Sequence, residues 1–401
     1  MATPALDLLL GAQARHVLAA AVGGYGGSLE RLRVTAADIQ PDTAAIVQYA
    51  GTVLRADGAR TAEVLVATTG SRIPSGATVI EGDHLGRLVE VGVWRWPQDP
   101  ALPALTLAND PNRLAELFRG FGLTTRRRLD ISVHTYRPAH RAVLEVTDGS
   151  RTWFVKVVRP SAAAPICRRH SLVGPCLPVP PVLASTPDGL IVFPRAAGTP
   201  MRSLIRSGDT LPPPDALAGL LDSLPSELMG FPARPSHVEC LHDQAAVLRN
   251  AAGTEPTVLT RVAEVVGAVD ELIADAGPLV PVHGDFYEGQ LLVDGDRITA
   301  LLDLDTAGPG HRVDDWATLL AHLSGLTLDD GHRGPARRYA AEVMAQAQRS
   351  VPISALRRHT AAALVGFATG PFRAQQQGWP AHTVARLELA MKWLAGAVGP
   401  A

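Results

Sequence analysis

Residues 281–305 read PVHGDFYEGQLLVDGDRITALLDLD, and this stretch decides how the chain folds around its site. Two short apolar runs flank the turn at 294–296, a pattern that predicts a β-hairpin. A hairpin returns the chain to its starting point, so its two ends, Gln290 and Asp303, should lie close together. Asp285 lies five residues before Gln290, on the loop that enters the hairpin. The sequence therefore predicts that two carboxylates and an amide oxygen meet in one small volume.

Phosphoryl transfer uses such a set of groups. One carboxylate orients the attacking hydroxyl and accepts its proton, while oxygen ligands hold magnesium against the nucleotide phosphates and a lysine neutralises them. The chain contains only two lysines, Lys156 and Lys392, although arginine is abundant. Lys156 lies in the predicted strand 151–158 and could be the lysine that neutralises the phosphates. A lysine kept in an arginine-rich chain points to a tight site, because a guanidinium cannot replace a compact ammonium there. The alternative is a lysine on the solvent face of an edge strand.

The motif at 283–290 and its hairpin resemble the aminoglycoside phosphotransferase and choline kinase family, a branch of the protein-kinase-like fold. That family carries an H-G-D-x4-N loop, a short hairpin, and an acidic metal ligand in an I-D-W or I-D-L sequence. The resemblance implies that Asp285 is the catalytic base and that His283 supports the loop. It also implies that Gln290 and Asp303 are the metal ligands, with ATP and Mg2+ as cofactors.

Gln290 stands where this family usually has asparagine. Glutamine keeps the amide oxygen but adds a methylene, so the metal geometry must shift slightly. Maltokinase and glucosamine kinase relatives carry the same substitution and an extra amino-terminal domain, so the motif is closest to theirs. The alternative is a Gln290 that faces outward. Asp305 is either a further metal ligand or a solvent-facing neighbour of Asp303.

The same resemblance assigns residues to the nucleotide. Lys156 corresponds to the phosphate-binding lysine, and its strand resembles the V-A-I-K strand of kinases. Phe193 and Arg195 match the hinge between the lobes, where backbone groups would contact adenine. The helix glutamate that usually pairs with the lysine has no counterpart, and His170 lies near its place. Lys156 would then be positioned by Asp303 or by the phosphates alone.

Four other segments carry weaker signals. The run at 314–317 predicts a helix start and resembles the family element whose aspartate caps this helix and ties down the catalytic loop. The loop at 136–141 lacks the glycine expected of the family, although its arginines could contact phosphate; the alternative is a plain solvated turn. The tryptophans of 94–97 favour a packed cluster over a carbohydrate platform. The polar and aromatic loop at 372–379 is either packed or a wall of the acceptor site.

We predict an α+β protein with a protein-kinase-like two-lobed fold and an extra N-terminal α+β cap domain. The expected division is a cap at 1–103, a small lobe at 104–195, and a mainly helical large lobe at 196–401 that holds the catalytic hairpin. The expected helices are 5–21 and 111–120, and the expected strands are 29–36, 44–54, 61–69, 85–94, 127–136, 141–147, 151–158 and 190–193. Prolines in 165–181 leave room for only a short helix.

Composition narrows the class of protein. The formal charge of -2 over 401 residues argues against a nucleic-acid partner. No uninterrupted apolar run of membrane-spanning length and no targeting segment occurs, so we expect no membrane partner and a cytoplasmic location. Three cysteines, too few and too irregularly spaced for a disulfide framework or a metal site, agree with a reducing compartment.

The expected function is ATP-dependent transfer of a γ-phosphate to a hydroxyl of a small polar acceptor, a sugar or an aminosugar. One alternative is an aminoglycoside-type antibiotic kinase, which acidic residues around the acceptor would favour. The other is a nucleotide-binding pseudokinase that acts as a regulatory module. The missing helix glutamate and Gln290 favour the pseudokinase, whereas the intact Asp285, Asp303 and Lys156 favour an enzyme. The sequence leaves the oligomeric state open.

Overall fold

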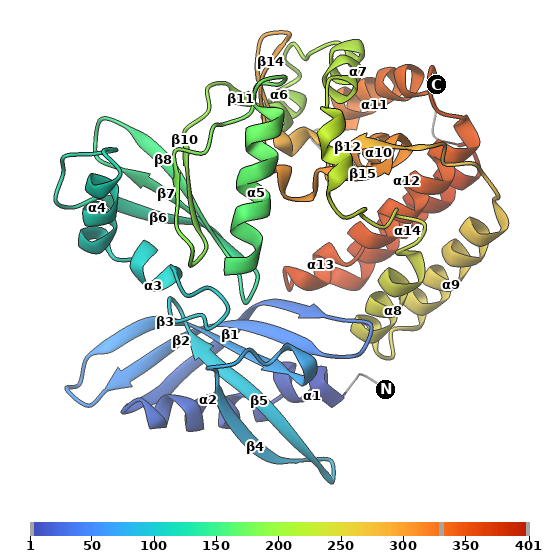
Figure 1. Cartoon of the computed structure of the whole chain (residues 1–401). Coiled ribbons are helices and arrows are strands. Elements are labelled where there is room, and N and C mark those ends of the chain that lie inside the picture. Colours follow the sequence, from blue (N-terminus) through green and yellow to red (C-terminus); the bar gives the residue numbers. More distant parts are fainter. Residues whose placement is uncertain (1–3, 329–332, 398–401) are drawn as a thin grey trace.

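The computed structural model describes residues 4–328 and 333–397, and its N-terminal part is a twisted antiparallel sheet with two helices against it (Figure 1). The strand order is β1-β2-β3-β5-β4. The elements of this part are α1 (Pro4–Leu10), α2 (Gln13–Gly24), β1 (Gly27–Ile39), β2 (Ala45–Arg55), β3 (Arg60–Thr69), η1 (Gly70–Arg72), β4 (Thr78–His84) and β5 (Arg87–Arg95).

Two predictions for this part are wrong in detail. The single helix expected over 5–21 is two helices, bent by 66° at Gly11 and Ala12. The strand expected over 85–94 is β5, and β4 before it was not predicted. β4 is an edge strand whose residues are mostly exposed, so it has no apolar alternation for a sequence pattern to detect.

The helices α1 and α2 bear on the question of a membrane. Within the described residues no single helix is long and apolar enough to cross a membrane. Taken together, the bent pair α1 and α2 has the length and the apolar composition of a span. Their buried leucines Leu6, Leu9 and Leu18 pack with Tyr49 and other residues of the sheet in one hydrophobic core. The apolar character of the pair therefore has a use inside the fold.

The second part is another five-stranded antiparallel sheet, of order β6-β7-β8-β10-β9. Its predicted strands are confirmed to within a few residues, as is the helix at 111–120. The elements are α3 (Leu105–Ala108), α4 (Pro111–Gly120), β6 (Asp130–Arg137), β7 (Arg141–Thr147), β8 (Thr152–Val158), α5 (Pro160–Val173), β9 (Ala184–Ser185) and β10 (Leu190–Pro194).

Helix α5 corrects the expectation of a short helix, since it runs for 14 residues. Pro160 occupies the first turn, where a missing N–H leaves no hydrogen bond unmade. The helix continues past Pro165 because Ala163 and Ile166 bury against Val158 and Phe193 of the sheet, and this burial outweighs the lost hydrogen bond.

The third part is mainly helical and is built around one large apolar core. The hairpin β13–β14 is confirmed, with Leu291 opposite Leu301 and Asp294 opposite Arg297. The elements are β11 (Thr199–Pro200), α6 (Met201–Ser207), α7 (Pro214–Asp222), η2 (Ser226–Gly230), α8 (Leu241–Ala252), α9 (Pro256–Glu271), β12 (Leu279–Val282), η3 (Glu288–Gln290), β13 (Leu291–Asp294), β14 (Arg297–Leu301), η4 (Leu304–Thr306), β15 (Gly308–His311), α10 (Arg312–Leu326), α11 (Arg333–Ala347), α12 (Ile353–Phe367), α13 (Gly370–Arg373) and α14 (Trp379–Leu394).

The N-terminal part contacts both of the others (Figure 1). Phe372, only 3% exposed, joins its hydrophobic core from the helical part. On the other side Trp94 packs with Ala139, and its indole N–H donates to the hydroxyl of Tyr136 at 3.1 Å. Trp94 is thus part of a packed cluster, as predicted for 94–97. We propose that the three parts are the cap, small lobe and large lobe divided near residues 103 and 195.

Candidate active site

The loop that carries His283, Gly284 and Asp285 is fixed to helix α10 by a buried carboxylate. Asp315, which is fully buried, accepts hydrogen bonds from the amides of His283 at 3.0 Å and of Gly284 at 2.8 Å. Burial raises the pKa of Asp315, while the nearby Arg312 and these amides oppose that shift. Asp315 therefore holds the backbone of the loop in one conformation against α10.

The His283 ring also supports this loop, and its contacts define its tautomer. Nε2–H donates to the carbonyl of Leu302 at 2.9 Å, and Nδ1 accepts from the amide of Asp285 at 3.3 Å. His283 is fully buried. It links the loop to Leu302, the residue that follows the second strand of the hairpin.

Gly284 is required by the backbone at this point. Its φ is +80°, and a Cβ added there would lie 2.7 Å from the carbonyl oxygen of Thr306. Glycine alone adopts this conformation without strain and leaves room for the neighbouring chain. The carbonyl of Gly284 accepts a hydrogen bond from Arg234.

The two aspartates that begin α10 have different roles, which corrects one expectation. Neither caps the helix, since α10 starts at Arg312 after an N-cap residue, His311, that makes no side-chain cap. Asp315 ties down the loop. Asp314 instead accepts from the imidazole of His359 at 2.8 Å, so it belongs to the packing between α10 and α12.

Asp285 itself is half-buried and available. Within the described residues its carboxylate has neither a hydrogen bond nor an ion pair, while its backbone is held by His283. Its charge is close enough to Arg141 to act on that residue's pKa. A positioned carboxylate without a protein partner can accept a hydrogen bond from a substrate hydroxyl.

The hairpin brings its two ends together, as the sequence predicts. The amide of Leu302 donates to the carbonyl of Gln290 at 2.8 Å. Gln290 is 7% exposed, and in the described parts of the chain its side-chain amide has no hydrogen-bond partner. Asp303 follows with φ +58° and ψ +62°, the left-handed conformation that non-glycine residues adopt infrequently. This sharp turn is a local strain of the kind found at functional sites.

Lys156 and Arg141 come from the small lobe and bind the two aspartates at the hairpin end. Lys156 Nζ lies 2.9 Å from Asp303 Oδ1 and 2.6 Å from Asp305 Oδ1. Arg141 Nη1 lies 3.0 Å from Asp303 Oδ2 and 3.5 Å from Asp305 Oδ2. Two cations thus face two anions, and Lys156 is only 8% exposed, so the lysine is buried against the hairpin rather than on the solvent face.

The two carboxylates differ in their proton affinity. Burial alone would raise the pKa of Asp303, but the charges of Lys156 and Arg141 hold that pKa below its usual value. Burial raises the pKa of Asp305, and repulsion by Asp303 adds to this against the attraction of Lys156. The surrounding cations therefore favour the ionised form of Asp303 more than that of Asp305.

His170 does not replace the missing helix glutamate. Its Nδ1 is 2.9 Å from the carbonyl of Pro180, and its ring packs against Phe193 at a centroid distance of 4.7 Å. Burial lowers the pKa of His170 to about 4, and the nearby charge of Lys156 contributes. The Nδ1 of His170 is thus engaged by Pro180 and the ring offers no negative charge, and the ammonium of Lys156 bonds the two hairpin aspartates instead.

The predicted hinge is an ordinary part of the small-lobe sheet. Phe193 lies opposite Phe154 on β8, and the amide of Arg195 donates to the carbonyl of Thr152 at 3.1 Å. That amide is therefore engaged within the sheet. The contact of Phe193 and Arg195 with adenine stays a prediction.

Arg141 ends the loop at 136–141, and its pairing with Asp303 shows that this loop is not a plain solvated turn. The contact of the loop arginines with phosphate stays a prediction. Two other residues near the site, Glu288 and Tyr287, were given no role by the sequence. Glu288, inside the motif, is fully buried and pairs with Arg202 at 2.8 Å. The ring of Tyr287 stacks on His322 at 4.0 Å. These contacts hold the loop between Asp285 and Gln290 against helices α6 and α10.

A two-lobed fold with a lysine facing hairpin aspartates, and an aspartate on a fixed loop, defines a kinase-like phosphotransferase. Residues 138–349, more than half of the chain, match the family model described as the phosphotransferase enzyme family. The chain belongs to this family and is a small-molecule kinase that uses ATP. No curated protein matches the chain in sequence at a significant level.

Solved structures agree on the fold. A thermostable mutant of aminoglycoside phosphotransferase APH(4)-Ia, in a ternary complex with ADP and hygromycin B, has a TM-score of 0.50 at 15% identity, covering 70% of this chain and 97% of that chain. Its apo form has a TM-score of 0.50 at 16% identity, covering 71% and 99%. A choline kinase from Cryptosporidium parvum Iowa II has a TM-score of 0.47 at 12% identity, covering 71% and 95%. At these identities the two likenesses with a TM-score of 0.50 show the fold alone.

Proposed function

We propose that this kinase phosphorylates a hydroxyl of a sugar or an aminosugar, with Asp285 as the base. The observation that carries the proposal is the free Asp285 carboxylate, held by its backbone beside the paired Lys156 and Asp303. Asp285 would accept the hydrogen bond of the acceptor hydroxyl and take its proton as the phosphate transfers. Such a base contributes roughly a hundredfold or more to the rate.

The donors at the hairpin fit Mg2+. Magnesium prefers oxygen ligands and commonly takes only one or two protein carboxylates, together with waters and substrate phosphates. Gln290 offers an unpartnered amide oxygen, Asp303 an ionised carboxylate, and Asp305 lies beside them. Bound magnesium would neutralise the nucleotide phosphates. Lys156 and Arg141, which hold both oxygens of Asp303 here, would then face those phosphates.

The charge around the loop favours a neutral acceptor over a polycation. Arg234 contacts the carbonyl of Gly284, and Arg141 lies close enough to Asp285 for their charges to interact. Arg141 is neutralised by Asp303, but Arg234 makes no ion pair among the described residues and would repel the several ammonium groups of an aminoglycoside. A sugar avoids that repulsion, and an aminosugar with one amine incurs less of it.

An ATP-consumption screen tests the proposal. ADP release is measured with neutral sugars, aminosugars and aminoglycosides, each with and without Mg2+, and Asp285→Asn is the matched control. We expect release that depends on a sugar or aminosugar and that Asp285→Asn reduces by roughly a hundredfold. Turnover with aminoglycosides alone would instead identify an antibiotic kinase. A wild type that binds ATP but transfers phosphate to none of these compounds would be a pseudokinase, in keeping with the absent helix glutamate.

A further inference from the structure

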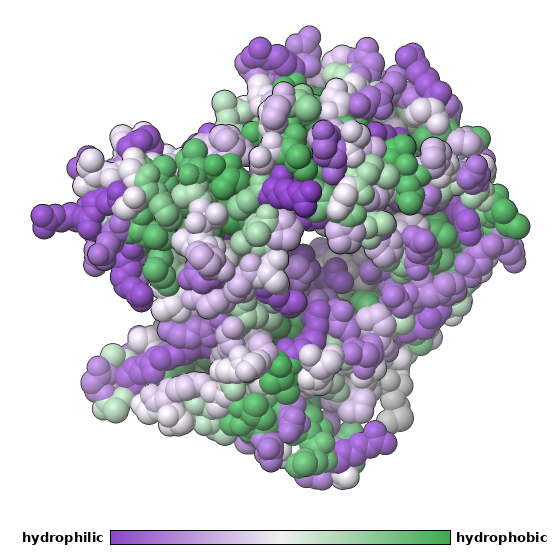
Figure 2. All heavy atoms as spheres, viewed as in Figure 1, coloured by the Kyte–Doolittle hydropathy of each residue, from purple (hydrophilic) through white to green (hydrophobic). Residues whose placement is uncertain are grey.

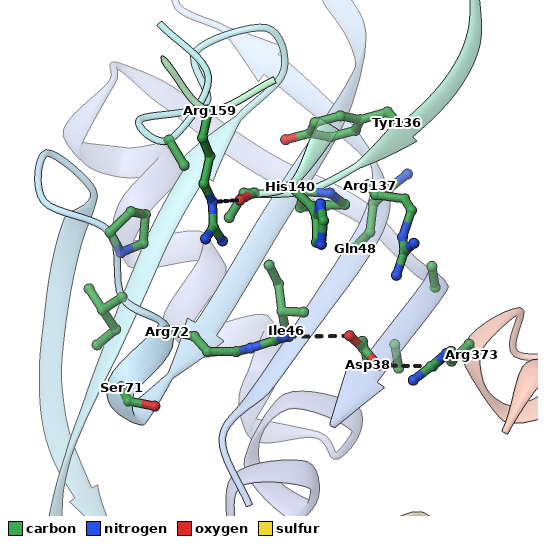
Figure 3. A pocket seen from close by; sticks show the side chains of 17 residues that line it. Asp38, Ile46, Gln48, Ser71, Arg72, Tyr136, Arg137, His140, Arg159 and Arg373 are labelled. Atoms are coloured by element: carbon green, nitrogen blue, oxygen red, sulfur yellow. Dashed lines mark hydrogen bonds and ion pairs between the residues drawn. The ribbon is translucent and has the colours of Figure 1, made fainter. Parts of the chain in front are cut away.

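A cavity of about 620 Å³ lies where the cap meets the kinase lobes (Figure 3). In Figure 2 the surface is hollowed between the lower part and the rest of the molecule, with hydrophilic residues inside the hollow. A cavity of this size suits a small molecule. We call it the cap pocket, and its lining residues are Ala36, Ala37, Asp38, Ile46, Gln48, Ser71, Arg72, Ile73, Pro74, Ala101, Tyr136, Arg137, Pro138, Ala139, His140, Arg159 and Arg373.

All three parts of the chain supply cations to the cap pocket. Arg72 comes from the cap, Arg137 and Arg159 come from the small lobe, and Arg373 comes from α13 of the large lobe. The labelled side chains of Figure 3 converge from these separate ribbons on one space. An anion bound there would contact segments that are far apart in the sequence.

One carboxylate of the lining partly balances this charge. Asp38 lies 3.3 Å from Arg72 and 3.0 Å from Arg373. Arg137 and Arg159 have no carboxylate within ion-pair distance among the described residues, and Arg159 Nε donates to a backbone carbonyl. Four guanidiniums therefore face one aspartate in the lining.

The cations act on one another as well. Loss of solvation lowers the pKa of Arg137, and repulsion from Arg141 and Arg373 adds a smaller contribution. Loss of solvation, followed by repulsion from Arg137 and Arg159, lowers the pKa of the neighbouring His140. Like charges that repel at close range are stabilised by a bound anion.

We propose that the cap pocket binds the phosphate group of a small phosphomonoester. Guanidinium groups match the oxygens of phosphate in bidentate geometry, and a dianion would offset most of the excess positive charge. Gln48 offers a neutral amide, and Ile46, Ile73 and Pro74 offer apolar surface for the carbon body.

The cap pocket is separate from the proposed nucleotide site. Neither Lys156, Asp285 nor Asp303 lines it. The two sites are nevertheless neighbours, since Arg137 in the lining lies directly opposite Arg141 in the β6–β7 register, and Arg141 binds Asp303. A ligand in the cap pocket would thus contact the hairpin whose other strand faces the catalytic aspartates.

Isothermal titration calorimetry on the full chain tests this site. The probes are glucose 6-phosphate and inorganic phosphate, with glucose as the neutral control, each titrated with and without Mg2+ and a non-hydrolysable ATP analogue. The analogue occupies the nucleotide site, so phosphate binding that persists in its presence belongs elsewhere. This measurement needs no turnover, so its result is independent of whether the proposed acceptor is correct.

The variants are Arg72→Gln and Arg159→Gln, and the control is Arg87→Gln, an exposed arginine of the cap outside the pocket. We expect each pocket variant to weaken glucose 6-phosphate binding by roughly tenfold or more, the effect of one charge-assisted contact, and the control to leave it unchanged. Arg159 makes no ion pair with any described residue, so Arg159→Gln keeps the test valid if Arg72→Gln loosens the cap.

Two results would overturn the proposal: no binding of either phosphate probe up to about 10 mM, or equal affinity in the wild type and both pocket variants. If the probe binds, ADP release measured in its presence then shows whether the site takes a phosphorylated acceptor or a separate phosphorylated ligand. Consumption of the probe with ATP makes the cap pocket a subsite for a phosphorylated acceptor. Binding without consumption makes it a site for a separate phosphorylated ligand, and both results support the phosphate site.

Discussion

Lys156 donates a 2.9 Å hydrogen bond to Asp303, a residue 147 positions further along the chain. The contact joins the small lobe to the catalytic hairpin and depends on the left-handed turn at Asp303. The ammonium bonds Asp305 at 2.6 Å as well, so one small cation bridges two carboxylates. This arrangement supplies the lysine with acidic partners in a chain that has no helix glutamate for it.

The first prediction concerns this lysine. Lys156→Ala should lower kcat/KM for ATP roughly thirtyfold or more, because a charge-assisted contact with phosphate is lost. This corresponds to a loss of about 2 kcal/mol of transition-state stabilisation. Lys156→Arg should not restore the activity, since the longer forked guanidinium cannot occupy the space between Asp303 and Asp305. Steady-state kinetics over a range of ATP concentrations measure both variants.

Lys392 provides the matched control for that measurement. It is the second lysine of the chain and lies on helix α14, and Lys392→Arg should leave the ATP kinetics unchanged. Normal kinetics in Lys156→Arg would show that this site needs only a positive charge, and the argument from the compact ammonium would then be wrong.

The second prediction concerns the docking of the cap. Phe372 is 3% exposed and lies in the core of the cap although it belongs to α13. Phe372→Ala should lower the free energy of unfolding by about 3 kcal/mol or more and should release the cap for limited proteolysis near residue 103. Urea unfolding followed by intrinsic fluorescence, together with the proteolysis pattern, measures the effect.

Met229→Ala is the control for this variant, because Met229 is 40% exposed and its truncation should change stability by only about 0.5 kcal/mol. An equally stable Phe372→Ala with an intact cap would mean that the other contacts of the cap, such as those of Val247, Ala251 and Arg373, hold it without Phe372.

The active-site hairpin was predictable because its signals are local. The turn at 294–296 and the short apolar runs beside it fix the register, and the register places Gln290 against Leu302. By contrast, β4 is an exposed edge strand without apolar alternation, and α5 continues through Pro165 because of tertiary burial. Neither depends on information that a short window of sequence contains.

Contacts between distant segments were harder to predict. The pairing of Lys156 with Asp303 was one of two alternatives that the absence of a helix glutamate left, the other being the phosphates alone. Arg141 was considered only as a phosphate contact or as part of a solvated turn. Its pairing with Asp303 was not predicted, since an arginine at a strand start resembles any solvated arginine in an arginine-rich chain. The cap pocket likewise joins Asp38 to Arg373, which lie 335 positions apart, and no local pattern predicts such a contact.

The third prediction concerns pH. Burial, and to a smaller extent the positive charge of Arg202, lowers the pKa of His322 from 6.5 to about 3. Between these values the unfolded state binds a proton that the folded state does not, so this contribution to stability is complete above pH 6.5 and falls as the pH falls. From about pH 6.5 to about pH 5 the loss is about 2 kcal/mol.

His322→Phe isolates that contribution, because phenylalanine can keep the ring contact with Tyr287 but cannot titrate. We expect the stability of the variant relative to the wild type to rise by about 2 kcal/mol when urea unfolding is repeated at about pH 5 instead of about pH 7. All other titrating groups occur in both proteins and cancel in the difference. A difference that does not change with pH would show that His322 is not held neutral by the fold.

The last prediction separates the proposed roles of Asp303 and Asp285. Asp303 is bound by two cations and lies beside the unpartnered amide of Gln290, whereas Asp285 has no partner among the described side chains. Asp303→Asn should therefore lose phosphoryl transfer and also lose the stabilisation by ATP that depends on Mg2+ in a thermal-shift assay. Asp285→Asn should keep that stabilisation, since its carboxylate would contact the acceptor rather than the nucleotide. Its turnover should nevertheless fall by roughly a hundredfold or more, the effect of a lost base and lost positioning.

Asp294→Asn, an exposed change at the hairpin turn, is the control and should behave like the wild type in both assays. Full activity of Asp285→Asn with a confirmed acceptor would show that another group accepts the proton, and a normal Mg2+-dependent shift in Asp303→Asn would place the metal elsewhere.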